Sequence, residues 1–174
     1  MDFDPERFRL VMGHFATGVT VVTVATQDGA DGITVNALSS VSLEPPLVMV
    51  ALDRRRHVVP AVRAAGRYAV NVLAEDQRHL ADCFAGAAVE PGRDDFCGAR
   101  WRPGETGLPL IDGAIATLEC TIVETVPVGD HDLFIGRVDS LATPRDEAPL
   151  VYFRRRYRRV EAATAIVPQG RPEP

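Results

Sequence analysis

The chain has 174 residues, 46% of them hydrophobic, which suits a single domain with a full core. Its net charge of −5 argues against nucleic acid as the main partner, and no apolar segment approaches the roughly 18–20 residues of a membrane span. All 19 basic side chains are arginine, as expected of a GC-rich bacterial genome, and this excludes a lysine Schiff base or a lysine general base.

Periodicity and turn residues predict short helices between β-strands. Asp4 followed by Pro5 is typical of a helix start, and Gly66 of a helix end. Pro45 and Pro46 predict a strand end, because proline cannot donate to a ladder. In chain order we expect a helix at 5–15, strands at 17–26, 32–42 and 47–52, a helix ending at 65, a strand at 68–73, a helix at 75–85, and strands at 114–126, 133–141 and 150–153.

These elements favour a mainly β fold, an antiparallel barrel or sandwich with helices packed outside. The first two strands are expected to form a hairpin through a turn at 27–32, and the apolar strand at 47–52 to be buried on both faces. The Gly- and Pro-rich segment 86–109 is expected to be one long loop. Residues 1–160 are expected to form the single domain, and residues 161–174 a flexible tail.

The cysteines and histidines show no spacing typical of a metal site. Cys83, Cys97 and Cys120 are odd in number and none is in a C-x-x-C pair, so we expect no disulfide framework, no metal and a reducing, cytoplasmic location. Cys83 is expected in the core, on the apolar helix face of Leu80 and Phe84. Cys97 has no histidine nearby in the sequence, so a nucleophilic role is not expected. The N-terminus shows no signal-peptide pattern.

The most informative segment runs from Gly32 to Ser42, with the sequence GITVNALSSVS. In one continuous strand, alternate residues share a face, and here one face is polar but uncharged. That face contains Thr34, Asn36, Leu38, Ser40 and Ser42. Neutral donors and acceptors suit a flat heteroaromatic ring such as a flavin. The alternative is an edge strand whose polar face meets water.

Two further segments are candidates for ligand contacts. The arginines at 54–56 follow a predicted strand and precede a helix, a position that favours phosphate binding, although a solvated surface loop is the alternative. The turn Gly129-Asp130-His131 separates two long strands; His131 is a candidate contact for a second substrate, or Asp130 simply closes the turn. The aromatic and basic run at 152–159 indicates a strand end with a solvated basic face rather than a nucleic-acid site.

Taken in order, these segments resemble the short-chain flavin reductases, the NAD(P)H-dependent reductase components of two-component monooxygenases. The likeness spans about residues 6–160. The segments that show it are FATGVTVVT at 15–23, GITVNALSSVSLEPP at 32–46, RYAVNVL at 67–73, LIDGAIATLE at 110–119, GDH at 129–131 with IGRV at 135–138, and PLVYF at 149–153 with its extension to residue 157.

The resemblance implies an FMN-binding split β-barrel, a Greek-key antiparallel barrel with short peripheral helices that acts as a homodimer. It implies a nicotinamide site at Gly129, Asp130 and His131, with His131 as the candidate catalytic residue. At positions 54–56 the chain has arginines where many relatives have serine or threonine. The implied flavin contacts are Thr34, Asn36, Ala37, Ser39, Ser40, Val41, Ala51, Asp53, Arg54, Arg56, His57, Phe96 and Tyr152.

The implied reaction is hydride transfer from NADH or NADPH to FMN or FAD, with reduced flavin diffusing to a partner monooxygenase. In such a reaction the two cofactors supply the chemistry, which agrees with the lack of a carboxylate pair for acid–base work and of G-x-G-x-x-G, P-loop and G-x-S-x-G motifs in this chain. Two alternatives remain at this point. One is an enzyme similar to pyridoxine phosphate oxidase on the same barrel, and the other is a non-catalytic flavin-binding or electron-carrier protein.

Overall fold

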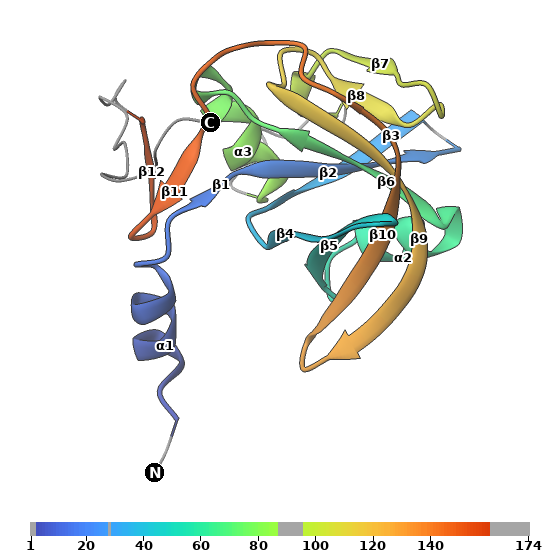
Figure 1. Ribbon diagram of the computed structural model, residues 1–174. Helices are drawn as coiled ribbons and strands as arrows, with labels where there is room; N and C mark the ends of the chain where they lie inside the picture. Colours follow the sequence, from blue (N-terminus) through green and yellow to red (C-terminus); the bar gives the residue numbers. More distant parts are fainter. Residues whose placement is uncertain (1–2, 28, 87–95, 161–174) are drawn as a thin grey trace, which may run out of the picture.

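The computed structural model describes residues 3–27, 29–86 and 96–160 and contains a seven-stranded antiparallel sheet of order β3-β2-β6-β9-β10-β5-β4 (Figure 1). The expected mainly β, antiparallel fold class is confirmed. The strands of this sheet are β2 Thr20–Thr26, β3 Gly29–Val35, β4 Leu38–Leu43, β5 Pro46–Asp53, β6 Arg67–Val72, β9 Ala116–Val128 and β10 His131–Ala142.

Smaller elements surround this sheet. A three-stranded sheet consists of β1 Thr17–Gly18, β11 Val151–Phe153 and β12 Arg156–Arg158, and a two-stranded one of β7 Trp101–Pro103 and β8 Pro109–Ile111. The helices are α1 Pro5–Met12, α2 Val58–Ala65 and α3 Arg78–Phe84, with 3₁₀ turns η1 Glu75–Gln77 and η2 Phe96–Gly98. No helix in the described ranges is long and apolar enough to cross a membrane.

The segment 32–42 is not one strand, contrary to expectation. β3 pairs with β2 and ends at Val35, whereas β4 begins at Leu38 and pairs with β5, so the two strands lie at opposite edges of the sheet order. The Thr20 hydroxyl donates to the Val35 carbonyl (2.7 Å), and the Ala51 N–H donates to the Ala37 carbonyl (3.1 Å). Residues 36–37 therefore carry the chain from one edge to the other and bring the two edges of the barrel together.

This break changes which side chains share a face. Leu38 packs against the core with Ile33 and Val35, although strict alternation placed it on the polar face. The prediction that the strand at 47–52 is buried on both faces was also wrong. In β5, Val48, Val50 and Leu52 face the core cluster and are buried, while the alternate residues on the other face are only partly covered.

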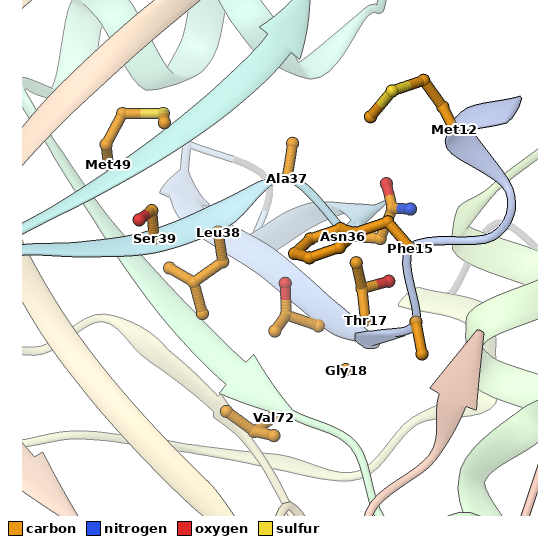
Figure 2. A pocket seen from close by; sticks show the side chains of 12 residues that line it. Met12, Phe15, Thr17, Gly18, Asn36, Ala37, Leu38, Ser39, Met49 and Val72 are labelled. Carbon is orange, nitrogen blue, oxygen red and sulfur yellow. The ribbon is translucent and has the colours of Figure 1, made fainter. Parts of the chain in front are cut away.

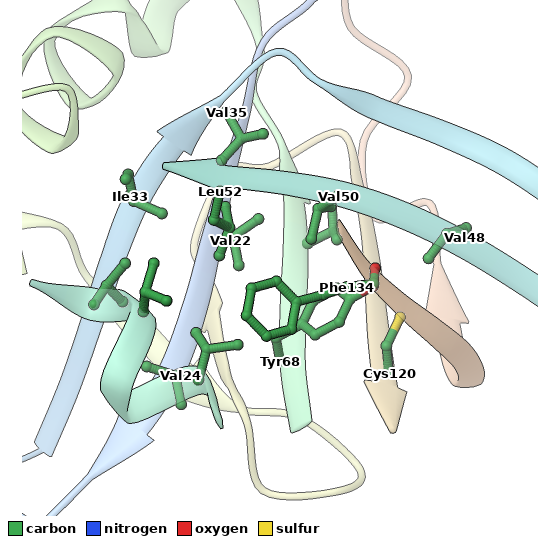
Figure 3. Packing of buried hydrophobic residues seen from close by; sticks show 14 residues of the cluster. Val22, Val24, Ile33, Val35, Val48, Val50, Leu52, Tyr68, Cys120 and Phe134 are labelled. Carbon is green, nitrogen blue, oxygen red and sulfur yellow. The ribbon is translucent and has the colours of Figure 1, made fainter. Parts of the chain in front are cut away.

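The core lies inside the barrel and is filled mainly by β-branched side chains (Figure 3). Tyr68 and Phe134 lie at its centre, and the Tyr68 hydroxyl donates to the Phe134 carbonyl (3.3 Å). The inner face of α2 closes this cluster with Val58, Val59 and Val62. A second cluster forms where α3 covers the outer side of β2, so that β2 is buried on both faces.

Helix α1 begins where predicted, because Asp4 Oδ1 accepts hydrogen bonds from the N–H groups of Glu6 (2.9 Å) and Arg7 (3.3 Å). It ends at Met12, not at residue 15. None of its residues is buried in the described chain, and Figure 1 shows it projecting from the barrel. Its apolar residues therefore do not contribute to the core of this chain.

The expected long loop at 86–109 was only partly correct, because residues 96–109 include η2, β7 and the start of β8; residues 87–95 lie outside the described ranges, as does the predicted tail at 161–174. The buried Asn71 side chain attaches β8 to the barrel. Its Oδ1 accepts from the Ile111 N–H (2.8 Å), and its Nδ2 donates to Thr23 Oγ1 (3.1 Å). Such satisfied buried amides fix the position of an attached segment.

The prediction of no disulfide was wrong. Cys83 of α3 forms a disulfide with Cys97 of η2, with a Cα–Cα distance of 6.0 Å, and Cys120 is buried and free. The two bonded cysteines are 14 residues apart, a separation without a local motif, so only the fold shows that they meet.

Gly136 of β10 lies against the Tyr68 ring, where a Cβ would be 2.5 Å from the Tyr68 oxygen and 2.8 Å from the Cys120 Cβ. We predict that Gly136→Ala lowers the free energy of unfolding by about 2 kcal/mol, because a fully buried ring would have to move. Denaturant titration measures the loss. Gly18→Ala is the matched control, since its Cβ would have no atom within 4 Å, and it should change stability by less than about 0.5 kcal/mol. Equal losses would contradict this account.

Candidate functional site

Three hollows follow one another along residues 30–39. The first, of about 240 Å³, is lined by Ala30–Ile33; the second, of about 210 Å³, by Thr34 and Asn36; and the third, of about 620 Å³, by Asn36–Ser39. Asn36 belongs to both the second and the third. We call these three the first, middle and large hollows.

The large hollow is apolar with a few uncharged polar groups (Figure 2). Met12 and Met49 lie on opposite sides of it, and the segment from Asn36 to Ser39 crosses between them. Not one of its lining residues is charged: Met12, Phe15, Ala16, Thr17, Gly18, Thr20, Asn36, Ala37, Leu38, Ser39, Met49 and Val72. Apolar walls with a few placed donors and acceptors are typical of cofactor sites.

Thr17 supplies the clearest indication of a ligand here. Its hydroxyl oxygen is buried and has no hydrogen-bond partner among the described residues, whereas the neighbouring Thr20 hydroxyl donates to Val35. A buried polar group without a partner costs about 1–3 kcal/mol, so it usually marks a missing ligand or water. Thr17 was not among the predicted site residues, although its segment at 15–23 is one of those that show the family resemblance.

The middle hollow combines Thr34 and Asn36 with Tyr152 and Tyr157. The Thr34 hydroxyl donates to the Ala81 carbonyl (2.7 Å), and this hydrogen bond joins β3 to α3. Because its hydrogen is used in this bond, the hydroxyl can act toward a ligand only as an acceptor. The two tyrosine rings form an edge-to-face pair with centroids 5.5 Å apart. Burial, with Asp82 nearby, raises the pKa of Tyr157 to about 12, which keeps its phenol neutral. Tyr157 was missed because β12 was not expected.

The first hollow is the one with basic side chains. Arg56 and His57, from the turn after β5, line it together with Phe84 and Phe96. His57 Nε2 lies 3.1 Å from Asp31 Oδ1. This hollow thus has both an apolar wall and groups that suit an anion.

Arg54 and Arg55 have other partners. The Arg54 side chain donates to the Gly129 carbonyl, and its main-chain N–H to the Asp130 carbonyl (3.1 Å). Arg55 pairs with Asp53 at 2.7 Å, and its hydrogen bonds hold the pKa of that carboxyl well below the usual range. Arg54, in the turn at 54–56, therefore positions the turn at 129–131. Of the three arginines at 54–56, only Arg56 lines the first hollow.

The turn at 129–131 lies beside the site rather than in it. His131 is paired in register with Asp53 of β5. The N–H of Ala51, two residues away on the same strand, donates to the Ala37 carbonyl. Asp53 and Ala51 are about 7 Å apart along β5. His131 Nδ1 lies 2.7 Å from Asp130 Oδ1, and this hydrogen bond lowers the pKa of Asp130.

The structure thus brings together only part of the predicted set. Thr34, Asn36, Ala37, Ser39, Arg56, His57, Phe96 and Tyr152 line the three hollows. The predicted residues that do not line them are Ser40, Val41, Ala51, Asp53, Arg54, Gly129, Asp130 and His131. Val41 sits at an irregularity of the β4–β5 pairing, and its side chain is exposed.

In this antiparallel barrel the crossing segment borders an uncharged hollow with an unpartnered hydroxyl, and an arginine and a histidine line a further hollow. This combination is that of a split-barrel protein with a site suited to a flavin nucleotide. The model of the flavin reductase like domain matches residues 12–161 of this chain. The chain belongs to this family, and the resemblance found in the sequence is confirmed.

Individual relatives agree with this assignment. The chain is 41% identical to an NADH-dependent flavin reductase of a Rhodococcus species, over 97% of this chain and 96% of the relative. It is 38% identical to the flavin-dependent monooxygenase reductase subunit HsaB of Mycobacterium tuberculosis, over 91% of this chain and 83% of that protein. The solved NADH:FAD oxidoreductase SgcE6 of Streptomyces globisporus C-1027, in complex with NAD and FAD fragments, superposes with a TM-score of 0.82 at 35% identity, over 93% of this chain and 98% of that one.

Proposed function

We propose that this chain is an NAD(P)H:flavin oxidoreductase that catalyses hydride transfer from nicotinamide C4 to flavin N5 and supplies reduced flavin to a partner monooxygenase. The observation that carries the proposal is the large uncharged hollow with the unpartnered Thr17 hydroxyl in its wall. The relatives named as NADH-dependent flavin reductase and monooxygenase reductase subunit support it.

The donor set fits a flavin. The large hollow suits the ring, with Asn36, Ser39 and Thr17 as hydrogen-bonding groups for its polar edge, and Met12, Phe15 and Met49 as the apolar groups that exclude water. Arg56 and His57, at the other end of the row of hollows, suit a phosphate. When bound, flavin and nicotinamide supply the hydride chemistry, while the protein binds and orients both.

The same geometry favours release of the flavin. Of the three hollows, only the first is lined by acidic or basic side chains, namely Asp31, Arg56 and His57. Of these, His57 already lies within hydrogen-bond distance of Asp31. A site with few ionic contacts binds an anionic nucleotide less tightly than one with several. We therefore propose that flavin is exchanged as a substrate rather than held permanently.

A second copy of the chain belongs to this proposal. Phe8, Val11 and Phe15 are each more than half exposed, and Leu43 is 91% exposed. Large apolar side chains exposed in this way suit an interface, and a homodimer would bury them. Because Met12 and Phe15 also line the large hollow, the partner copy would cover the open side of the flavin site.

The first test is loss of NADH or NADPH absorbance on mixing the protein with free FMN or free FAD, in all four pairings. We expect flavin-dependent oxidation in at least one pairing, and NADH as the better donor. No oxidation in any pairing contradicts the proposal. A tightly bound yellow flavin without nucleotide oxidation would instead select an electron carrier, and flavin reduction by pyridoxine phosphate would select the oxidase-like alternative.

Thr17→Val removes the unpartnered hydroxyl without changing the shape of the side chain. We expect the Kd for flavin, measured by quenching of flavin fluorescence, to rise about tenfold, which corresponds to one lost hydrogen bond of about 1.4 kcal/mol. The free energy of unfolding should not fall, because the hydroxyl has no protein partner to lose. Thr17→Ser keeps the hydroxyl and is the control. Unchanged binding by Thr17→Val would reject the contact.

His131→Ala tests the nicotinamide assignment. We expect the KM for the nicotinamide nucleotide to rise about fivefold or more and that for flavin to change less than about twofold, because the contact lies on the nucleotide side. His57→Ala is the matched control and should do the reverse, since His57 lines the first hollow. Equal effects of His131→Ala on both KM values would rule out this assignment.

A further inference from the structure

The Cys83–Cys97 disulfide forms part of the wall of the first hollow. Both cysteines line it, together with the rings of Phe84 and Phe96 that follow and precede them in the sequence. These rings meet edge to face with centroids 5.0 Å apart. Arg56 and His57 line the same hollow. The disulfide therefore lies where the proposed flavin site has its basic side chains.

The disulfide is also the covalent link between η2 and α3. Within residues 78–86 and 96–99, each backbone hydrogen bond stays inside its own element, as in Ala99 N–H to Phe96 O (3.0 Å) and Gly86 N–H to Cys83 O (2.9 Å). The two elements are held together by the disulfide and by the contact of Phe84 with Phe96. Phe96 and Cys97 of η2, and Ala99, also pack against the apolar cluster that contains Leu80 and Ala81 of α3.

The backbone of η2 adopts a conformation that needs such support. Phe96 has φ of 48° and Cys97 of 57°, in the left-handed region that non-glycine residues seldom occupy. Each such residue costs on the order of 1 kcal/mol and persists only when its surroundings impose it. Loss of the disulfide removes one of the restraints that impose it, so η2 is the part expected to rearrange.

On these observations we propose that Cys83 and Cys97 are positioning residues for the flavin site, and that their redox state sets the affinity for flavin. In the oxidised form the disulfide holds η2, and with it Phe96, in the wall of the first hollow. A dithiol reduces it: the protein S–S bond breaks, each sulfur gains one electron and one proton, and the dithiol becomes a disulfide. Phe96 then leaves the wall and flavin binds less tightly. The inference rests on the proposed function.

Cys120 provides an internal reference. It is fully buried, and burial raises the pKa of its thiol to about 12, so it does not react with thiol reagents in the native protein near neutral pH. The oxidised protein should therefore show no reactive thiol when native and one when denatured. The reduced protein should show two when native, because only Cys83 and Cys97 become available.

The test compares three forms of the full chain: oxidised, reduced by dithiothreitol and desalted without air, and the Cys83→Ser/Cys97→Ser double variant. The Kd for FMN and for FAD is measured by flavin fluorescence. Emission of Trp101, the single tryptophan, whose ring lies 6.1 Å from that of Phe96, reports the position of η2 without flavin. Circular dichroism verifies that all three forms are folded.

We expect the Kd to be about tenfold higher in the reduced protein and in the double variant, and dithiothreitol to have no effect on the double variant. Trp101 emission should shift on reduction of the parent protein only. Two or more reactive thiols in the native protein before reduction, unchanged Trp101 emission, or equal Kd values in all three forms would each overturn the inference. Equal flavin binding would leave the proposed function standing, whereas absence of flavin binding in every form would overturn both.

Discussion

The site depends on the passage of the chain from one edge of the sheet to the other at Asn36 and Ala37. Because β3 pairs with β2 and β4 with β5, these two residues belong to neither ladder, and a single bond from Ala51 to the Ala37 carbonyl guides the crossing. Main-chain groups outside a ladder are available to a ligand. The large and middle hollows share Asn36 for this reason. Their other lining residues come from the elements that lie next to residues 36–37.

Charge is kept away from the large hollow and concentrated at one end of β5. There Asp53, Arg54 and Arg55 bind one another or the turn at 129–130, and this network positions His131 next to Asp53. Arg54 and Arg55 are exposed, so these pairs contribute little to stability, and their main effect is on local geometry. The proposed flavin ring site remains neutral, which agrees with hydride chemistry carried out by two cofactors and with the proposed exchange of the flavin.

The outer layers are attached to the barrel by buried polar groups. Asn71 holds β8, and the buried Glu119 carboxylate accepts from the N–H groups of Glu105 (2.8 Å) and Thr106 (2.9 Å), which fixes the turn between β7 and β8. On the opposite side, Phe84 packs directly on Gly32, where a Cβ would lie 3.1 Å from its ring. Among the described residues, η2 is attached instead by a disulfide and by apolar packing, and the disulfide is the attachment that reduction would break.

The sequence by itself determined the features that depend on neighbouring residues. The start of α1 at Asp4, the end of α2 at Gly66, whose φ is 64°, and the antiparallel class follow from capping residues and from alternating runs between turns. The ordered family segments also led to the prediction of a flavin segment at 34–42, of which Thr34 and residues 36–39 line the hollows. Only the tertiary structure decided the break at 36–37, the Cys83–Cys97 bond, the unpartnered Thr17 hydroxyl and the separation of His131 from the hollows. Each of these depends on contacts between residues distant in sequence, for which local periodicity and spacing contain no signal.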